Sequence, residues 1–148
     1  MFTTMNSNVR TFKRGEVYYA DLRNTQGSEQ GGVRPVLILQ NDTGNFYSPT
    51  IIIVPLTSKV KREDLLTHYT LSKEKNKFLV DDSVACAEQI RAVDKSRFKN
   101  YIGTLNKADL RAITGIVFAN LCGDWLEWNG WTDKKRKKGI LCGKAGEN

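Results

Sequence analysis

Histidine and cysteine are scarce in this chain of 148 residues. His68 is the only histidine, which excludes a metal site built on two histidines and a hydrolytic mechanism that pairs a histidine acid with a histidine base. We expect His68 to be an ordinary surface or packed residue rather than a proton carrier. Cys86, Cys122 and Cys142 cannot all pair within one chain, and none lies in a Cys-x-x-Cys motif, so we expect reduced thiols.

Long apolar segments are also lacking. The longest run, residues 51–56, contains Pro55 and falls far short of the roughly 20 residues that a membrane-spanning helix needs. The first 12 residues contain no apolar segment followed by a small-residue cleavage site. We therefore expect a cytoplasmic protein that does not enter a membrane, and the length indicates one compact domain.

Acidic residues are outnumbered, with 16 aspartates and glutamates against 23 lysines and arginines, for a formal charge of +7 and a pI of about 9.4. This balance favours a polyanionic partner. Residues 129–148 carry a net +4 and an unbroken basic run at 134–138. We expect this tail to be mobile, as a phosphate contact or as a solubilising extension.

Short β-rich runs separated by turn-forming residues dominate the first hundred positions. A segment dense in turn residues, 41–49, is predicted to be a turn. Because proline cannot donate to a ladder, Pro35 and Pro55 are expected at a strand edge, end or bulge. The pattern predicts a short, curled antiparallel sheet with strands at residues 16–22, 33–39, 50–56, 67–71 and 83–93.

The period changes after residue 105. Apolar residues recur every three or four positions, Asn106 suits an N-cap, and Asp109 falls in the first turn. The spacing predicts a terminal helix packed on the sheet through Leu110, Ile113, Val117 and Leu121.

Residues 23–32 separate the first two predicted strands and form a loop that we expect to contact a ligand. It contains three glycines and no apolar anchor, and Ser28, Glu29 and Gln30 offer donors and acceptors at its tip. Arg34 follows directly, and Pro35 favours an extended conformation for it, so the guanidinium is positioned to bind a phosphate. A flexible linker and a salt-bridged surface arginine are the alternatives.

Two further segments carry polar groups that suit phosphates and nucleobases. The third apolar run ends with Thr57, Ser58 and Lys59, whose side chains could bind one anion. The alternative is that these hydroxyls only form hydrogen bonds with the backbone at the strand end. Residues 88–91, read as mid-strand, place Glu88 and Ile90 on one face and Gln89 and Arg91 on the other. Such side chains can pair with splayed bases, or simply face water.

These segments, in this order and spacing, closely resemble the MazF/PemK toxin family, especially its members from Gram-positive bacteria. The resemblance runs from about Lys13 to Leu126, and we place the toxin-like domain at residues 13–128, with residues 1–12 as an N-terminal extension and residues 129–148 as a tail outside the family pattern. It rests on residues 14–22, on residues 27–42, which begin with the Gly-Ser-Glu-Gln-Gly-Gly-Val-Arg-Pro block, and on the segments 48–50, 55–57 and 88–91.

The resemblance implies a mainly β fold with α, an SH3-like small β-barrel with a C-terminal helix. It also implies a homodimeric, metal-independent endoribonuclease without cofactors, which cleaves single-stranded messenger RNA at a short sequence and arrests growth. A cognate MazE-like antitoxin would hold it inactive.

By position, Arg34 and Thr57 match the catalytic arginine and threonine of the family. Ser28, Glu29 and Gln30 match its active-site loop, with Glu29 a possible base. The RNA-binding positions would be Ser58, Lys59, Lys61, Arg62, Glu88, Gln89 and Arg91. Two other functions remain open, a non-catalytic RNA-binding module and a gyrase poison built on a similar barrel.

Overall fold

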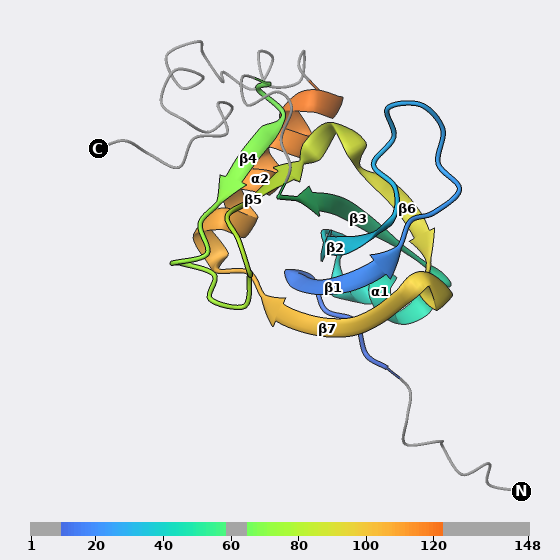
Figure 1. Ribbon diagram of the computed structural model, residues 1–148. Helices are drawn as coiled ribbons and strands as arrows, with labels where there is room; N and C mark the ends of the chain where they lie inside the picture. The colour runs from blue at the N-terminus through green and yellow to red at the C-terminus, as the bar shows by residue number, and fades with distance from the viewer. Residues whose placement is uncertain (1–9, 59–64, 123–148) are drawn as a thin grey trace, which may run out of the picture.

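A computed structural model describes residues 10–58 and 65–122 of the chain (Figure 1). The mainly β architecture with a C-terminal helix is confirmed. One strand, β7, was not predicted. The elements are β1 (Glu16–Asp21), β2 (Val33–Ile38), α1 (Asp42–Tyr47), β3 (Thr50–Thr57), β4 (His68–Leu71), β5 (Ser83–Cys86), the 3-10 helix η1 (Ala87–Gln89), β6 (Arg91–Asp94), the 3-10 helix η2 (Lys95–Arg97), β7 (Phe98–Thr104) and α2 (Lys107–Leu121).

All strand pairs of the described residues are antiparallel and belong to one strongly curled sheet. The order is β4-β5-β3-β2-β1-β7, and β6 also pairs with β3. Figure 1 shows the strands wrapping around a common interior. Within the described residues β4 does not pair with β7, so hydrogen bonds do not close the predicted barrel.

The predicted strand at residues 83–93 is wrong as a single element. It consists of β5, the turn of η1 and β6. Both strands pair with β3, β5 at Leu56–Thr57 and β6 at Thr50–Ile53, so the chain must turn between these two stretches. Glu88 and Gln89 therefore lie in a 3-10 turn, and their predicted placement on alternate faces of a strand is incorrect.

The predicted turn at residues 41–49 is a short helix, α1. The side chain of Asn41 caps it by accepting a hydrogen bond of 2.8 Å from the backbone N–H of Gly44. The helix ends at Tyr47, two residues before Pro49. Asn, Asp and Gly suit both turns and helix N-termini, which explains the ambiguity of this segment.

The two prolines of the sheet limit its pairing, as their lack of an N–H predicts. Pro35 pairs with Tyr19 of β1, and the register of β2 with β3 stops at Val36 and Pro55. On the opposite side of β3, Pro55 lies between the stretch paired with β6 and the stretch paired with β5. Beyond Val36 and Pro55, β2 and β3 therefore have no pairing within the described residues.

Both faces of the central strands are buried, which explains why their sequences are continuous apolar runs rather than alternating ones. One cluster, including Leu37, Val54 and Leu56, packs with α2. The other includes Val36, Ile53 and aromatic side chains. Phe12, the last residue of the predicted N-terminal extension, belongs to this second cluster and contacts Tyr18 and Phe98, with ring centroids 5.1 and 4.9 Å away.

The terminal helix α2 packs against β4 and η1. Its predicted cap is confirmed, since the side chain of Asn106 accepts a hydrogen bond from the N–H of Asp109. Ile113 and Val117 are buried as predicted, whereas Leu121, at the last turn, is 64% exposed. Within the described part of the chain, no helix is long and apolar enough to cross a membrane.

A buried carboxylate fixes the start of α2 to the sheet. Asp109 accepts hydrogen bonds from Tyr69 of β4 (2.7 Å), from Asn76 of the following loop (2.9 Å) and from Asn106 (2.6 Å). Three donors satisfy a charge that would be costly to bury alone. Burial and the bond to Asp109 also raise the pKa of the Tyr69 hydroxyl.

We predict that Tyr69→Phe lowers the free energy of unfolding by about 1 to 3 kcal/mol, because Asp109 loses a donor in a buried site. Since the folded-state pKa of Tyr69 is raised, this stabilisation is present below the unfolded tyrosine pKa of about 10 and declines at higher pH. Urea unfolding at pH 7 and pH 11 measures both effects. Tyr101→Phe, which removes a surface bond to Thr104, should change stability by less than about 0.5 kcal/mol; equal losses in both variants would contradict the role of Asp109.

Candidate active site

The guanidinium of Arg34 is held by the loop that precedes β2. Its Nε donates to the carbonyl oxygen of Gly31, and its Nη1 donates to Oε1 of Gln30 at 2.7 Å. Gly32, between them, has a φ of +75°, a conformation that favours glycine and allows the tight return into β2. Both partners are neutral, so these two contacts leave the charge of Arg34 uncompensated.

The turn η1 also contacts this loop, through hydrogen bonds of Gln89. The side-chain oxygen of Gln89 accepts a hydrogen bond from the N–H of Gln30 at 3.3 Å, and its Nε2 donates to the carbonyl oxygen of Ser28 at 3.4 Å. Glu29, at the tip, is exposed, and its carboxylate accepts from the N–H of Gln26. The structure thus brings together the predicted loop, Arg34 and Gln89.

Thr57 lies at the end of β3 that adjoins the start of β2. The last pair of these strands is Val36 with Pro55, so Arg34 and Thr57 each lie two residues beyond the end of the pairing, at the same end of the two strands. Thr57 and Ser58 line a cavity of about 430 Å³, together with Pro35. Arg34 is not among its lining residues, because its side chain turns towards the loop.

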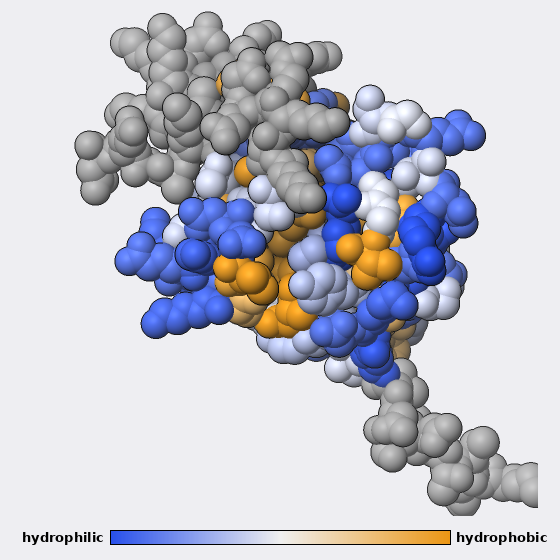
Figure 2. Space-filling view, in the orientation of Figure 1, coloured by the Kyte–Doolittle hydropathy of each residue, from blue (hydrophilic) through white to orange (hydrophobic). Residues whose placement is uncertain are grey.

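The cavity occupies the space where β2 and β3 separate. Its walls come from β1, β2, β3, β5, β7 and the segment between β4 and β5. Figure 2 shows apolar side chains at the centre of this face, surrounded by hydrophilic ones. The remaining lining residues are Tyr19, Leu56, Phe78, Leu79, Val80, Asp81, Ser83 and Ile102.

Arginines concentrate positive charge beside the loop. Burial lowers the pKa of Arg91, at the start of β6, and the charges of Arg97 and Arg34 lower it further, while Glu29 opposes the shift. Arg97 was not predicted as a site residue. It lies in η2 and donates a hydrogen bond to the carbonyl oxygen of Asp21 at 3.1 Å. The two residues are 76 positions apart, and no sequence motif predicts their contact.

Glu88 faces His68 rather than the loop. Its Oε1 lies 2.8 Å from Nε2 of His68, and the two side chains are 28% and 12% exposed. His68 is therefore a packed residue of β4. Burial raises the pKa of the neighbouring Cys86 thiol to about 12, with Glu88 adding to the shift and Arg34 opposing it. Cys86 and Cys122 are both free thiols.

Several predicted positions lie outside the described residues. These are Lys59, Lys61 and Arg62, residues 1–9 of the predicted extension, residues 123–128, Cys142 and the basic tail at 129–148.

Known proteins share both the sequence pattern and the fold. Residues 13–117 match the family model of the PemK-like, MazF-like toxins of type II toxin–antitoxin systems. The chain is 45% identical over 109 residues to the endoribonuclease MazF of Staphylococcus saprophyticus, covering 74% of this chain and 90% of that protein.

Solved structures of lower sequence identity have the same fold. The crystal structure of MazF from Deinococcus radiodurans superposes with a TM-score of 0.66 at 23% identity, covering 76% of this chain and 98% of that one. A mycobacterial endoribonuclease in complex with its cognate antitoxin gives a TM-score of 0.58 at 22% identity, covering 78% and 96%. The family model spans most of the chain, and the staphylococcal relative matches nearly its own full length, so this chain belongs to the PemK/MazF family of type II toxin–antitoxin toxins.

Proposed function

We propose that this chain is the endoribonuclease toxin of its system and cleaves single-stranded messenger RNA at a short sequence. The observation that carries the proposal is a loop that holds the charged Arg34 through neutral partners next to Gln89 and Arg91, with Thr57 and Ser58 in the wall of a cavity at the end of β3. The staphylococcal relative, named an endoribonuclease, supports the same activity.

The reaction needs no external nucleophile. The 2′-hydroxyl of the ribose attacks the adjacent phosphorus, a bond forms between that oxygen and phosphorus, and the 5′-oxygen leaves. The products are a 2′,3′-cyclic phosphate and a 5′-hydroxyl. The protein must align the ribose, stabilise charge on the phosphorane, accept one proton and return one.

Arg34 stabilises the negative charge that develops on the phosphorane. A guanidinium remains protonated at neutral pH and can bind two phosphate oxygens, which makes electrostatic stabilisation a better role than proton transfer. Its partners in the structure, an amide and a carbonyl oxygen, bind it less strongly than a carboxylate would. A scissile phosphate can therefore displace Gln30 and bind Arg34.

Thr57 and Ser58 supply hydroxyl donors from the wall of the cavity. The volume of about 430 Å³ lies within the usual range of small-ligand sites, and the apolar walls suit one splayed nucleotide. Glu29, on the exposed loop tip, is our choice for the acceptor of the 2′-hydroxyl proton.

Substrate recognition falls to η1 and β6. Gln89 offers an amide beside the loop, and Arg91 offers a partly buried cation. Glu88 is engaged by His68, so base recognition by Glu88 requires that this contact be broken. Single strands are favoured because both the 2′-hydroxyl and the base edges must be free, which a stacked duplex prevents.

The proposal extends to partners and location. An antitoxin of the MazE kind would bind this toxin and cover the RNA site, as a cognate antitoxin is bound in the mycobacterial structure. We also propose that the toxin acts as a homodimer in the cytoplasm, where messenger RNA is available.

We predict that Arg34→Ala lowers single-turnover cleavage of a single-stranded RNA by about 100- to 1,000-fold, the usual cost of removing one donor that stabilises transition-state charge. RNA binding should weaken far less. The assay is run in excess EDTA with mapping of cyclic-phosphate ends, and a duplex of the same sequence should resist. Wild-type protein that retards RNA without cutting it would indicate a binding module. Growth arrest that survives Arg34→Ala would favour a gyrase poison.

Thr57→Val keeps the volume of the side chain but removes its hydroxyl, so we expect cleavage to fall by at least tenfold while RNA affinity changes by less than twofold. Thr70→Val, an exposed position on β4, is the matched control and should leave both quantities unchanged. Undiminished cleavage by Thr57→Val would remove this residue from the site.

Arg91→Gln should reduce the salt dependence of RNA binding. For single-stranded nucleic acid each phosphate contact contributes about 0.7 to the slope of log affinity against log salt concentration. Fluorescence anisotropy between low and high salt measures the slope for wild type, Arg91→Gln and the control Arg111→Gln, an exposed residue of α2. An unaltered slope in Arg91→Gln would show that this guanidinium does not contact phosphate.

A further inference from the structure

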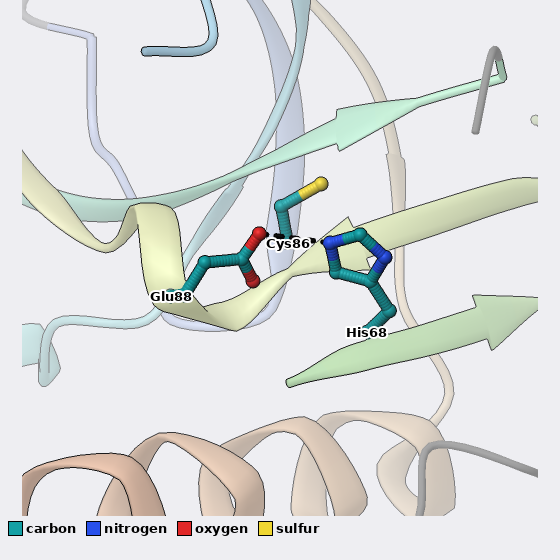
Figure 3. A group of neighbouring side chains, drawn as sticks. All are labelled: His68, Cys86 and Glu88. Atoms are coloured by element: carbon teal, nitrogen blue, oxygen red, sulfur yellow. Dashed lines mark hydrogen bonds and ion pairs between the residues drawn. The ribbon is translucent and has the colours of Figure 1, made fainter. Parts of the chain in front are cut away.

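Three side chains of different ligand types converge where β4, β5 and η1 meet. His68 and Cys86 are paired residues of the antiparallel strands β4 and β5, so their side chains emerge on the same face. Glu88 follows two residues later in η1 and returns towards them (Figure 3). The fold thus gathers a nitrogen, a sulfur and a carboxylate oxygen at one point.

The distances suit a metal ion. One ligand atom from each residue lies within 4.8 Å of the other two. Zinc binds nitrogen, oxygen and thiolate sulfur at about 2.0 to 2.3 Å, which separates tetrahedral ligands by about 3.5 Å. Nε2 of His68 and Oε1 of Glu88, now 2.8 Å apart, must separate by about 0.7 Å, and the wider separations in the set, none above 4.8 Å, must shrink by at most about 1.3 Å. Small side-chain rotations can produce displacements of this size.

Glu88 provides an independent observation that favours a cation at this cluster. Its Oε1 contacts His68, but its Oε2 is buried and has no hydrogen-bond partner among the described residues. A buried carboxylate oxygen without a donor is energetically costly and calls for a cation or a donor.

The charges of such a site would balance. A thiolate and a carboxylate carry two negative charges, which a divalent cation neutralises, and the neutral imidazole completes the set. The guanidinium of Arg34 acts on Cys86 from one side, so a ligand set of lower charge would leave the cation exposed to its repulsion. Cys86 is fully buried, whereas His68 and Glu88 are partly exposed and leave an approach for the ion.

We propose that His68, Cys86 and Glu88 bind one thiophilic divalent cation of the zinc type, with water as the fourth ligand. The ion takes the place of the direct contact between His68 and Glu88. The chemistry proposed for RNA cleavage uses no metal, and metal binding by this cluster can be tested without RNA. The scarcity of histidine excludes a site with two histidines, but one histidine with a thiol and a carboxylate is sufficient.

The test uses the full chain, dialysed against EDTA and kept reduced with a non-chelating phosphine, and titrates it with Co²⁺. We expect one equivalent to produce tetrahedral visible bands and a thiolate-to-cobalt charge-transfer band, both removed by one equivalent of Zn²⁺. Cys86→Val should abolish the charge-transfer band. Cys122→Val, which alters the other described free thiol, should retain it.

Glu88→Gln and His68→Gln keep the size of the side chains and test the remaining ligands. Each should weaken Co²⁺ binding by at least tenfold, and Zn²⁺ should raise the thermal unfolding midpoint of wild type but not of these variants. Circular dichroism of the metal-free proteins checks whether each variant is folded. If Cys86→Val is unfolded, Co²⁺ binding by Glu88→Gln decides the test instead. A charge-transfer band that survives Cys86→Val, or no saturable band in wild type, would overturn the proposal.

Discussion

Strand β3 pairs with three other strands, and the rest of the structure depends on where those pairings begin and end. β2 occupies one side, while β6 and β5 share the other side in succession. Pro55 lies where the partner changes, and Pro35 lies where β2 leaves β3. Since neither residue can donate a backbone hydrogen bond, the ladder ends there and the strand ends separate. The cavity lies in that separation, and Thr57 and Ser58 line it.

The same change of partner creates the turn η1. Because β5 and β6 both pair with β3 at different places, the chain between them must reverse its course locally, and this turn carries Glu88 and Gln89. Gln89 then reaches the loop before β2, whereas Glu88 points to His68. Because of this turn, two adjacent polar residues have different partners: Gln89 contacts the loop before β2, and Glu88 contacts His68.

Local patterns predicted the strands up to residue 71 and the capped terminal helix, since apolar runs and the Asn106 cap are short-range signals. The resemblance of the 27–35 block and the 88–91 segment to a toxin family supplied the barrel-like fold, which is confirmed, and the candidate site residues, which remain predictions. The joining of β5 to β6 by a turn was not predictable from residues 83–93, because the break follows from pairing with β3. Nor could the sequence show that His68 meets Glu88, 20 residues away, or that Asp109 is buried against Tyr69.

The hydrogen-bond partners of Arg34 determine how easily a phosphate can replace them in the proposed reaction. A carboxylate partner would neutralise the guanidinium and would have to be displaced against a strong, partly buried attraction. The structure instead gives Arg34 an amide and a backbone carbonyl, both on a loop that Gln89 fastens through two long hydrogen bonds of 3.3 and 3.4 Å. In the proposed reaction, such contacts orient the side chain and yield to a phosphate, which carries the opposite charge. Glu29 lies on the same loop, so displacement of Gln30 by that phosphate would also reposition the carboxylate proposed to accept the 2′-hydroxyl proton.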